Sequence, residues 1–170
     1  MRSLNSCFVL VTLLAATAVA HAQNQLSTVT CDFDSGQQLA AEYQPYAINL
    51  KKPLFGPQIP SGKVWAPGGK PITLFANTPV EIGGQQLKVG AYTVFVIPSP
   101  KLWTLVISRS TDTSGKYDES MDLVRVPMES GELPSPEAHL NIAFAHVGPN
   151  QCSLRLEVAT VGSDVVFTRK

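Results

Sequence analysis

The sequence predicts an all-β protein: a single antiparallel β-sandwich, or a flattened barrel, of about nine strands that follow a cleaved signal peptide. Three runs predict this class, at residues 72–75, 92–97 and 102–107, and each is rich in β-branched and aromatic residues. Neither alternate set of side chains in these runs is polar, which is typical of strands covered on both faces. Gly83-Gly84 lies between the first two runs and can take the positive φ angles that a two-residue type I′ hairpin requires. We therefore expect an antiparallel meander across this stretch, at the centre of one β domain.

The N-terminus has the pattern of a secretory signal peptide. Arg2 supplies a positive charge, residues 7–19 form an apolar run too short to span a bilayer, and an Ala-His-Ala sequence ends at Ala22. We expect cleavage after Ala22, so that residues 1–22 form the signal peptide; an uncleaved anchor is the alternative. Because no second long apolar run follows, we expect an exported protein, periplasmic or extracellular, with no membrane span after cleavage.

Cleavage would leave 148 of the 170 residues, which is the length of one typical domain. We divide this chain into an N-terminal strand region, residues 23–38, and the sandwich domain, residues 39–170. Only Arg2 is lost from the 13 basic residues, so 12 remain against 13 acidic ones, and Lys51-Lys52 is the longest basic run. A net charge near −1 gives no reason to expect nucleic acid or an anionic membrane as the partner.

Two cysteines remain after export, Cys31 and Cys152. In an oxidising compartment an even pair predicts a disulfide, which here would join the first strand to a late one. In the chain-entropy account, a bridge that closes so long a loop stabilises the fold by about 4–5 kcal/mol. Two buried free thiols are the alternative.

The elements before the meander are assigned from alternation and from turn residues. Residues 26–33 alternate weakly and predict a first strand, and residues 39–46 predict a second. Residues 51–62 contain three prolines and two glycines, which excludes a helix or a central strand. We expect an ordered loop there, held by the apolar side chains that need burial: Leu54, Phe55 and Ile59.

The elements after the meander are assigned in the same way. Residues 109–122 are polar and predict a long loop that contains at most one short turn of helix. Residues 129–136 predict a Pro-bearing connection. The remaining strands are expected at residues 123–128, 139–147, 153–158 and 161–168, the last with a candidate bend at Gly162-Ser163.

A set of spaced motifs resembles a known family. In chain order the motifs are Phe55-Gly56, Gly62-Lys63-Val64-Trp65, Val80-Glu81-Ile82-Gly83-Gly84, Leu87, Gly90-Ala91-Tyr92-Thr93-Val94-Phe95-Val96-Ile97-Pro98, Trp103-Thr104-Leu105-Val106-Ile107, Tyr117-Asp118 and Asp122-Leu123-Val124-Arg125-Val126. With these motifs the chain, from about Leu39 to the C-terminus, resembles the secreted bacterial domain-of-unknown-function family numbered twenty-nine eleven. The resemblance implies an all-β exported domain with no assigned activity and no assigned cofactor.

The chain also departs from the pattern of that family. After Trp65 the family typically has an Arg, a Thr-Gly pair and then Ala-Asn, whereas residues 66–70 here read Ala-Pro-Gly-Gly-Lys. If the Arg and Asn form a ligand site in relatives, this chain has lost it. The segment before Leu39 resembles the family poorly.

The sequence offers little for catalysis or metal binding. His139 and His146 are seven positions apart on one predicted strand and would point to opposite faces, whereas zinc usually takes three or four protein ligands. The chain has no Gly-x-Ser-x-Gly nucleophile elbow. The acids Asp118, Glu119 and Asp122 do not fit an EF-hand, and we interpret them as a solvated loop. We expect no cofactor and no metal, and a hydrolase with an unrecognised site is the least favoured alternative.

The aromatic residues carry the functional prediction. Trp103 lies inside an apolar run and is expected in the core, whereas Trp65 lies beside a Gly-rich turn. Trp65 would either stack on a sugar or peptide at the rim of the sandwich or cap the core. We take Trp65, Lys63, Tyr46 and Tyr117 as candidate ligand-binding residues. The favoured function is an exported, non-catalytic β-sandwich that binds a small ligand, a glycan or a peptide, or an envelope protein; a purely structural or accessory domain is the alternative.

Overall fold

The computed structural model describes residues 25–170, and the predicted signal peptide, residues 1–22, lies outside them. The described chain consists of strands and turns with two short 3-10 helices, η1 (Pro67–Gly69) and η2 (Glu119–Met121). The strands are β1 (Ser27–Asp32), β2 (Gln38–Tyr43), β3 (Tyr46–Ala47), β4 (Ile72–Ala76), β5 (Val80–Ile82), β6 (Gln85–Leu87), β7 (Gly90–Ile97), β8 (Thr104–Ser108), β9 (Asp122–Pro127), β10 (Glu129–Gly148) and β11 (Gln151–Arg169). The all-β prediction is confirmed, and the described strands are more numerous than expected.

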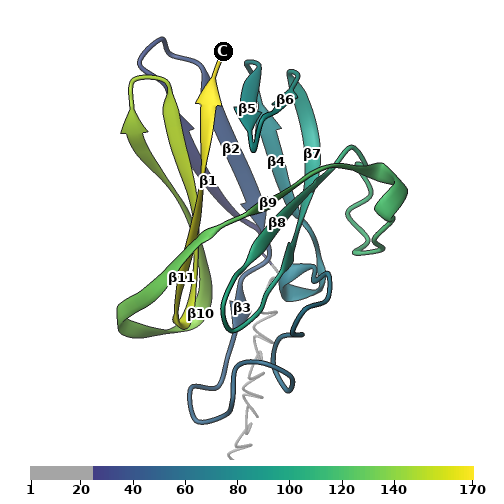
Figure 1. Ribbon diagram of the computed structural model, residues 1–170, viewed down its shortest axis with the longest axis vertical. Helices are drawn as coiled ribbons and strands as arrows, with labels where there is room; N and C mark the ends of the chain where they lie inside the picture. The colour runs from purple at the N-terminus through teal and green to yellow at the C-terminus, as the bar shows by residue number, and fades with distance from the viewer. Residues whose placement is uncertain (1–24) are drawn as a thin grey trace, which may run out of the picture.

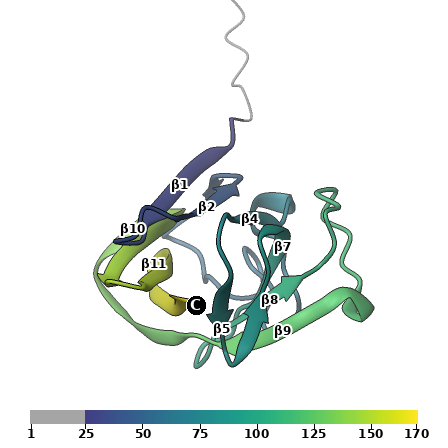
Figure 2. The same cartoon turned by 90° about the horizontal axis from the view of Figure 1, so that it is seen from above.

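The strands form two antiparallel sheets that pack face to face (Figures 1 and 2). One sheet has six strands in the order β1-β2-β4-β7-β8-β9, and the other has five in the order β3-β10-β11-β5-β6. Alternate side chains of both sheets, such as Leu74, Leu105, Leu154 and Phe167, fill the space between them. Because neither sheet closes on itself, the architecture is the predicted sandwich and not the flattened barrel.

The predicted meander is confirmed as β4, β7 and β8, which are neighbours in the six-stranded sheet. Val94 faces the core between the sheets, and Phe95, on the opposite face of β7, is only 2% exposed. The polar loop, residues 109–121, covers that outer face, and the Tyr117 ring packs edge-on against Phe95 with ring centroids 5.2 Å apart. Both faces of these strands are covered, which explains why both sets of alternate side chains are apolar.

The predicted two-residue hairpin joins β5 to β6. Ile82 pairs with Gln85, and Gly83 and Gly84 have φ angles of 55° and 78°, both positive as a type I′ turn requires. A Cβ atom at Gly83 would lie 2.6 Å from Cγ2 of Val126 on β9, whereas a Cβ atom at Gly84 would meet open space. Gly83 is therefore needed both for its backbone angle and for this close approach.

Between β9 and β10 the chain passes from one sheet to the other through a single residue. β9 is an edge strand of the six-stranded sheet, and only Met128 separates it from β10 of the five-stranded sheet. Met128 is 1% exposed, and its N–H donates to the carbonyl oxygen of Trp103 at 2.8 Å. Trp103 lies in the core, as predicted. Figure 2 shows the continuous ribbon of β9 and β10 running around this side of the sandwich.

The expected connection at residues 129–136 is wrong, because this segment is the first part of β10. Glu132 still pairs with Val161 of β11, and the register then shifts before Glu137. Both prolines of the segment lie within that shift. Proline lacks the N–H that a ladder needs but is tolerated at such an irregularity, so the prolines interrupt the strand without ending it.

β11 folds back on itself, so that the β10–β11 ribbon makes a U-turn (Figure 1). The Ser153 hydroxyl donates to Oδ2 of Asp164 at 3.1 Å, and the Arg169 N–H donates to the carbonyl oxygen of Asn150 at 2.8 Å. An extended strand rises about 3.3 Å per residue, so these contacts require the two halves of β11 to lie side by side.

The turn of β11 lies at Ala159, not at the expected Gly162-Ser163. Ala159 has a φ of 50°, in the left-handed region that few non-glycine residues adopt. β10 follows the outer side of the turn and needs a longer path. Between residues 132 and 137, β10 advances five positions while its partner β11 advances two, so the register shift follows from the shape of the ribbon.

The predicted disulfide is confirmed, with the sulfur atoms of Cys31 and Cys152 2.02 Å apart. It joins β1 of the six-stranded sheet to β11 of the five-stranded sheet. Both residues are almost fully buried. Within residues 25–170 no helix is both long enough and apolar enough to cross a membrane.

Candidate functional site

Three segments meet at the lower end of the sandwich in Figure 1, which we call the loop end. They are the Pro-rich loop (residues 48–63), the β7–β8 connection (residues 98–103) and the ribbon bend (residues 133–137 of β10 and 159–161 of β11). The Gly62 N–H donates to the carbonyl oxygen of Pro98 at 2.8 Å and ties the first two segments together.

Two of the predicted ligand-binding residues, Tyr46 and Trp65, pack against each other beside the loop end. Their rings meet edge to face, with centroids 5.7 Å apart and an interplanar angle of 74°. Trp65 forms an antiparallel bridge with Val96 of β7 through two backbone hydrogen bonds, of 2.8 and 3.0 Å. Both aromatic side chains are partly buried against the core, so they support the loop end from beneath.

The Pro-rich loop is ordered, as predicted, and Gln58 organises it. The Gln58 side-chain amide accepts a hydrogen bond of 2.6 Å from the Asn49 N–H. It donates to the carbonyl oxygens of Asn49, Lys52 and Pro53 at 3.1, 3.3 and 3.1 Å. The Tyr46 hydroxyl donates to the carbonyl oxygen of Gln58 at 2.6 Å.

The apolar side chains of the loop are placed as expected. Ile59 is 1% exposed, and Leu54 and Phe55 pack on the core. The role of Gln58 was not predicted from the sequence. The only signal was its amide side chain among three prolines, because proline has no N–H and leaves loop carbonyl groups in need of another donor.

A hollow of about 260 Å³ opens between the Pro-rich loop and the ribbon bend. Its apolar lining is Ile48, Leu50, Leu54, Pro136 and Ala159, and its polar lining is Asn49, Lys52, Gln58 and Thr160. A second hollow of about 250 Å³ lies between the ribbon bend and the β7–β8 connection, and Thr160 and Lys101 line it. Thr160 therefore stands between two hollows, with one lysine on each side.

The loop end combines exposed leucines with lysines. Leu50 is 49% exposed and Leu102 is 47% exposed, although they lie on different loops. The Pro-rich loop and the β7–β8 connection together hold four exposed lysines and no acidic residue: Lys51, Lys52, Lys63 and Lys101. Lys63 is thus the predicted candidate that lies on this surface. The sequence shows these lysines as scattered, because 50 positions separate the first from the last.

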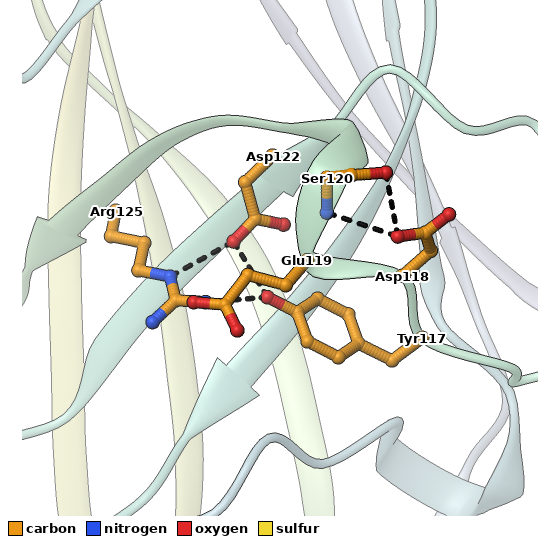
Figure 3. A network of polar contacts seen from close by, with 6 residues as sticks. All are labelled: Tyr117, Asp118, Glu119, Ser120, Asp122 and Arg125. Atoms are coloured by element: carbon orange, nitrogen blue, oxygen red, sulfur yellow. Dashed lines mark hydrogen bonds and ion pairs between the residues drawn. The ribbon is translucent and has the colours of Figure 1, made fainter.

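Tyr117, the fourth predicted residue, belongs to a different site on the outer face of the six-stranded sheet (Figure 3). Its hydroxyl donates to Oδ2 of Asp122 at 2.6 Å and accepts from Nη2 of Arg125 at 2.6 Å. Arg125 also donates through Nε to Asp122 Oδ2 at 2.9 Å, and through Nη2 to Glu119 at 2.8 Å. The network fastens the polar loop over Phe95.

The electrostatics of this network favour a structural role for Tyr117. Burial, followed by the hydrogen bond to Asp122, raises the pKa of Tyr117 to about 12, so the phenol remains a neutral donor near neutral pH. The hydrogen bond to Asp122 also raises the pKa of Arg125. The Asp122 side chain is only 13% exposed, which differs from the solvated acid that the sequence suggested. Asp118 is exposed and caps η2 by accepting from the Ser120 N–H.

The segment that departs from the family pattern lies under the polar loop. Gly69, in η1, presents its carbonyl oxygen so closely to Gly115 that a Cβ atom at Gly115 would lie 2.7 Å from it. A Cβ atom at Gly68 would lie 2.9 Å from the carbonyl oxygen of Gln44. Gly68 therefore lies against the backbone at Gln44, and Gly69 lies against the backbone at Gly115.

The two histidines have different neighbours. His146 Nε2 is 3.2 Å from Oδ1 of Asp34, with both side chains about half exposed. His139, on β10, pairs with Ala47 of β3. Within residues 25–170 no three His, Cys, Asp or Glu side chains form a group that could hold a metal ion.

A smaller hollow of about 130 Å³ lies on the five-stranded sheet, where Gly131 pairs with Gly162. One arginine and three acids line it: Arg155, Glu132, Glu157 and Asp164. Two of the acids have hydrogen-bond donors nearby, since Asn141 donates to Glu157 at 3.0 Å and Ser153 donates to Asp164.

The chain matches the model of a known family. A family model described as "Protein of unknown function (DUF2911)" matches residues 24–166. The match begins before β1, earlier than the resemblance near Leu39 suggested, and it ends within β11. No curated protein and no solved structure matches the chain.

Proposed function

We propose a function for this chain, which belongs to the family described as a protein of unknown function (DUF2911). It is an exported, non-catalytic β-sandwich whose loop end binds either a small ligand, such as a glycan or a peptide, or an envelope protein. The observation that carries the proposal is the hollow of about 260 Å³ between the Pro-rich loop and the ribbon bend. Ligand sites are concave, largely apolar and fitted with a few polar groups that fix orientation.

The walls of this hollow are held in place before any ligand arrives. The Gln58 side chain donates hydrogen bonds to three loop carbonyl oxygens, and the Tyr46 hydroxyl donates to the backbone carbonyl oxygen of Gln58. On the opposite wall, Ala159 is fixed by the turn of β11. A preorganised site loses less conformational entropy when it binds, which favours binding by a small surface.

Export is supported by two features. The disulfide between Cys31 and Cys152 is of the kind that persists in oxidising compartments. The sequence before Gln23 has a charged start, a short apolar run and small residues at the expected cleavage point.

Glycan and peptide arrays probed with the chain that begins at Gln23 test the proposal. Thr160 is exposed between the two hollows, so Thr160→Arg would obstruct both without disturbing the core. We expect Thr160→Arg to weaken the wild-type array signals at least about tenfold, a loss of about 1.4 kcal/mol. Thr113→Arg, at an exposed position of the polar loop, is the control and should keep them. Silent arrays, or signals that Thr160→Arg leaves intact, would refute a glycan or peptide ligand at the loop end.

A structural or accessory domain is the second candidate, and the packing of Trp65 on Tyr46 and on the core supports it. Trp65→Ala separates a capping role of Trp65 from a role in ligand binding. If Trp65 is a cap, the variant loses about 3 kcal/mol of unfolding free energy and the folded fraction keeps its ligand affinity. Unchanged stability with lost binding would instead place Trp65 in the binding site.

A further inference from the structure

We propose that the loop end docks on an anionic lipid surface, with Leu50 and Leu102 in the headgroup region and the four lysines against lipid phosphates. This partner goes beyond the proposed ligand site and uses the same end of the molecule. The net charge of the chain does not indicate such a partner, because the basic residues are concentrated only when the chain is folded.

The two leucines are presented by rigid turns. Leu102 is held in the β7–β8 connection, where its N–H donates to the Ser99 hydroxyl at 3.0 Å and the hydroxyl donates to the Leu102 carbonyl oxygen at 2.6 Å. Leu50 lies in the loop that Gln58 holds. Each leucine is about half exposed, so each exposes apolar area to water that an interface would bury.

The charges complement an anionic surface. Four lysines and no acid lie on the Pro-rich loop and the β7–β8 connection. Lys52 and Lys101 flank Thr160 from opposite sides, which places two of the charges around one point of the surface. Near these lysines, Glu132 lines the second hollow and Glu137 lies in the ribbon bend, so two acids stand against the four lysines. Each lysine near an anionic lipid surface strengthens binding, and salt weakens this electrostatic attraction by screening it.

Exposed leucine and lysine on neighbouring loops favour a lipid surface over an acidic peptide. A bilayer offers apolar depth and negative charge over a wide area, so loops that are separate in sequence can contact it together. The hollow beside Leu50, in contrast, has a volume of only about 260 Å³ and does not include Leu102 in its lining.

Vesicle co-sedimentation tests the inference, using the chain that begins at Gln23, which contains every described element. The probes are vesicles of phosphatidylcholine alone and vesicles with about 30% phosphatidylglycerol. We expect binding to the anionic vesicles only, and a large loss of binding when the salt concentration is raised to about 0.5 M.

Matched variants locate the contact. Lys51→Gln with Lys52→Gln should lower the partition coefficient about 30-fold, and Leu50→Ser should lower it about fivefold. Lys88→Gln and Val89→Ser are the controls, because these residues are exposed between β6 and β7, away from the loop end. All of the altered side chains are exposed, so each variant should keep the wild-type melting temperature.

The outcomes separate this inference from the proposed function. Equal binding to both vesicle types, no binding to either, or equal loss in the control variants overturns the lipid inference. Binding to a soluble acidic peptide without vesicle binding also overturns it and leaves the ligand proposal standing. Vesicle binding that depends on the lysines, together with silent arrays, supports the lipid surface and removes the glycan or peptide ligand.

Discussion

Ser153 and Asp164 share a hydrogen bond of 3.1 Å although they belong to one strand and are 11 residues apart. The contact exists because β11 doubles back at Ala159 and brings its second half beside its first. The second half continues to β5, where Thr168 pairs with Glu81. One turn thus allows a single strand to connect the hairpin β5–β6 with β10.

Ala159 should tolerate glycine and reject a β-branched residue. Ala159→Val is expected to lower the unfolding free energy by about 2 kcal/mol, because a branched side chain is strongly disfavoured at a positive φ. Ala159→Gly should change it by less than about 1 kcal/mol, since relief of backbone strain offsets the greater freedom of the unfolded chain. Urea unfolding of both variants measures this difference, and an equal loss in both would argue against a left-handed residue here.

Removal of the disulfide should destabilise the fold substantially. Cys31 and Cys152 are 121 residues apart, and a bridge over so long a loop is expected to stabilise the protein by about 4–5 kcal/mol through the unfolded state. Replacement of both cysteines by alanine should therefore shift the guanidinium midpoint downward. Thiol titration of the unreduced, unfolded chain that begins at Gln23 is the companion measurement, and two reactive thiols would contradict the bridge.

Tyr117 should give the stability a dependence on alkaline pH. Its pKa is about 12 in the folded protein and about 10 in an unfolded chain. The folded state therefore favours the protonated phenol, so this contribution is fully present below pH about 10 and is lost as the pH rises toward about 12. Melting temperatures of wild type and Tyr117→Phe measured across this range should converge at high pH. A constant difference between the two proteins would show that the phenol does not titrate in the expected window.

The two hairpin glycines should differ in their tolerance of alanine. Gly84→Ala meets open space and should cost about 1 kcal/mol for its backbone angle alone. Gly83→Ala adds a clash with Val126 and should cost about 2–3 kcal/mol. Thermal unfolding of the pair, with Gly84→Ala as the matched control, tests this. Equal losses would mean that β9 moves aside freely.

The sequence was most informative where local rules and tertiary structure agree. The apolar runs of β7 and β8 predicted coverage on both faces, and the polar loop supplies the outer cover. Gly83-Gly84 predicted its hairpin because only glycine takes two successive positive φ angles cheaply. The buried position of Trp103 followed from the same periodicity.

The predictions from sequence were wrong where the tertiary structure overrides local sequence signals. Prolines after Met128 indicated a connection, yet the outer path of a bent ribbon provides an irregular stretch that accommodates them. Ala159 carries no turn signal, so the doubling of β11 was not foreseen. Of the four candidate ligand residues, Tyr46, Lys63 and Trp65 lie at or beside the loop end, while Tyr117 lies on another face. Contacts between distant segments, such as Tyr117 over Phe95, leave no periodic trace in the chain.

The bond between Cys31 and Cys152 also defines how the domain responds to mechanical tension. When the two ends are pulled, the force enters along β1, crosses directly from sulfur to sulfur, and leaves through β11. The intervening chain, including the meander and the Pro-rich loop, forms a closed ring off that line and bears no pull. Stretching would therefore extend only β1 and β11, while residues 32–151 stay enclosed within the ring.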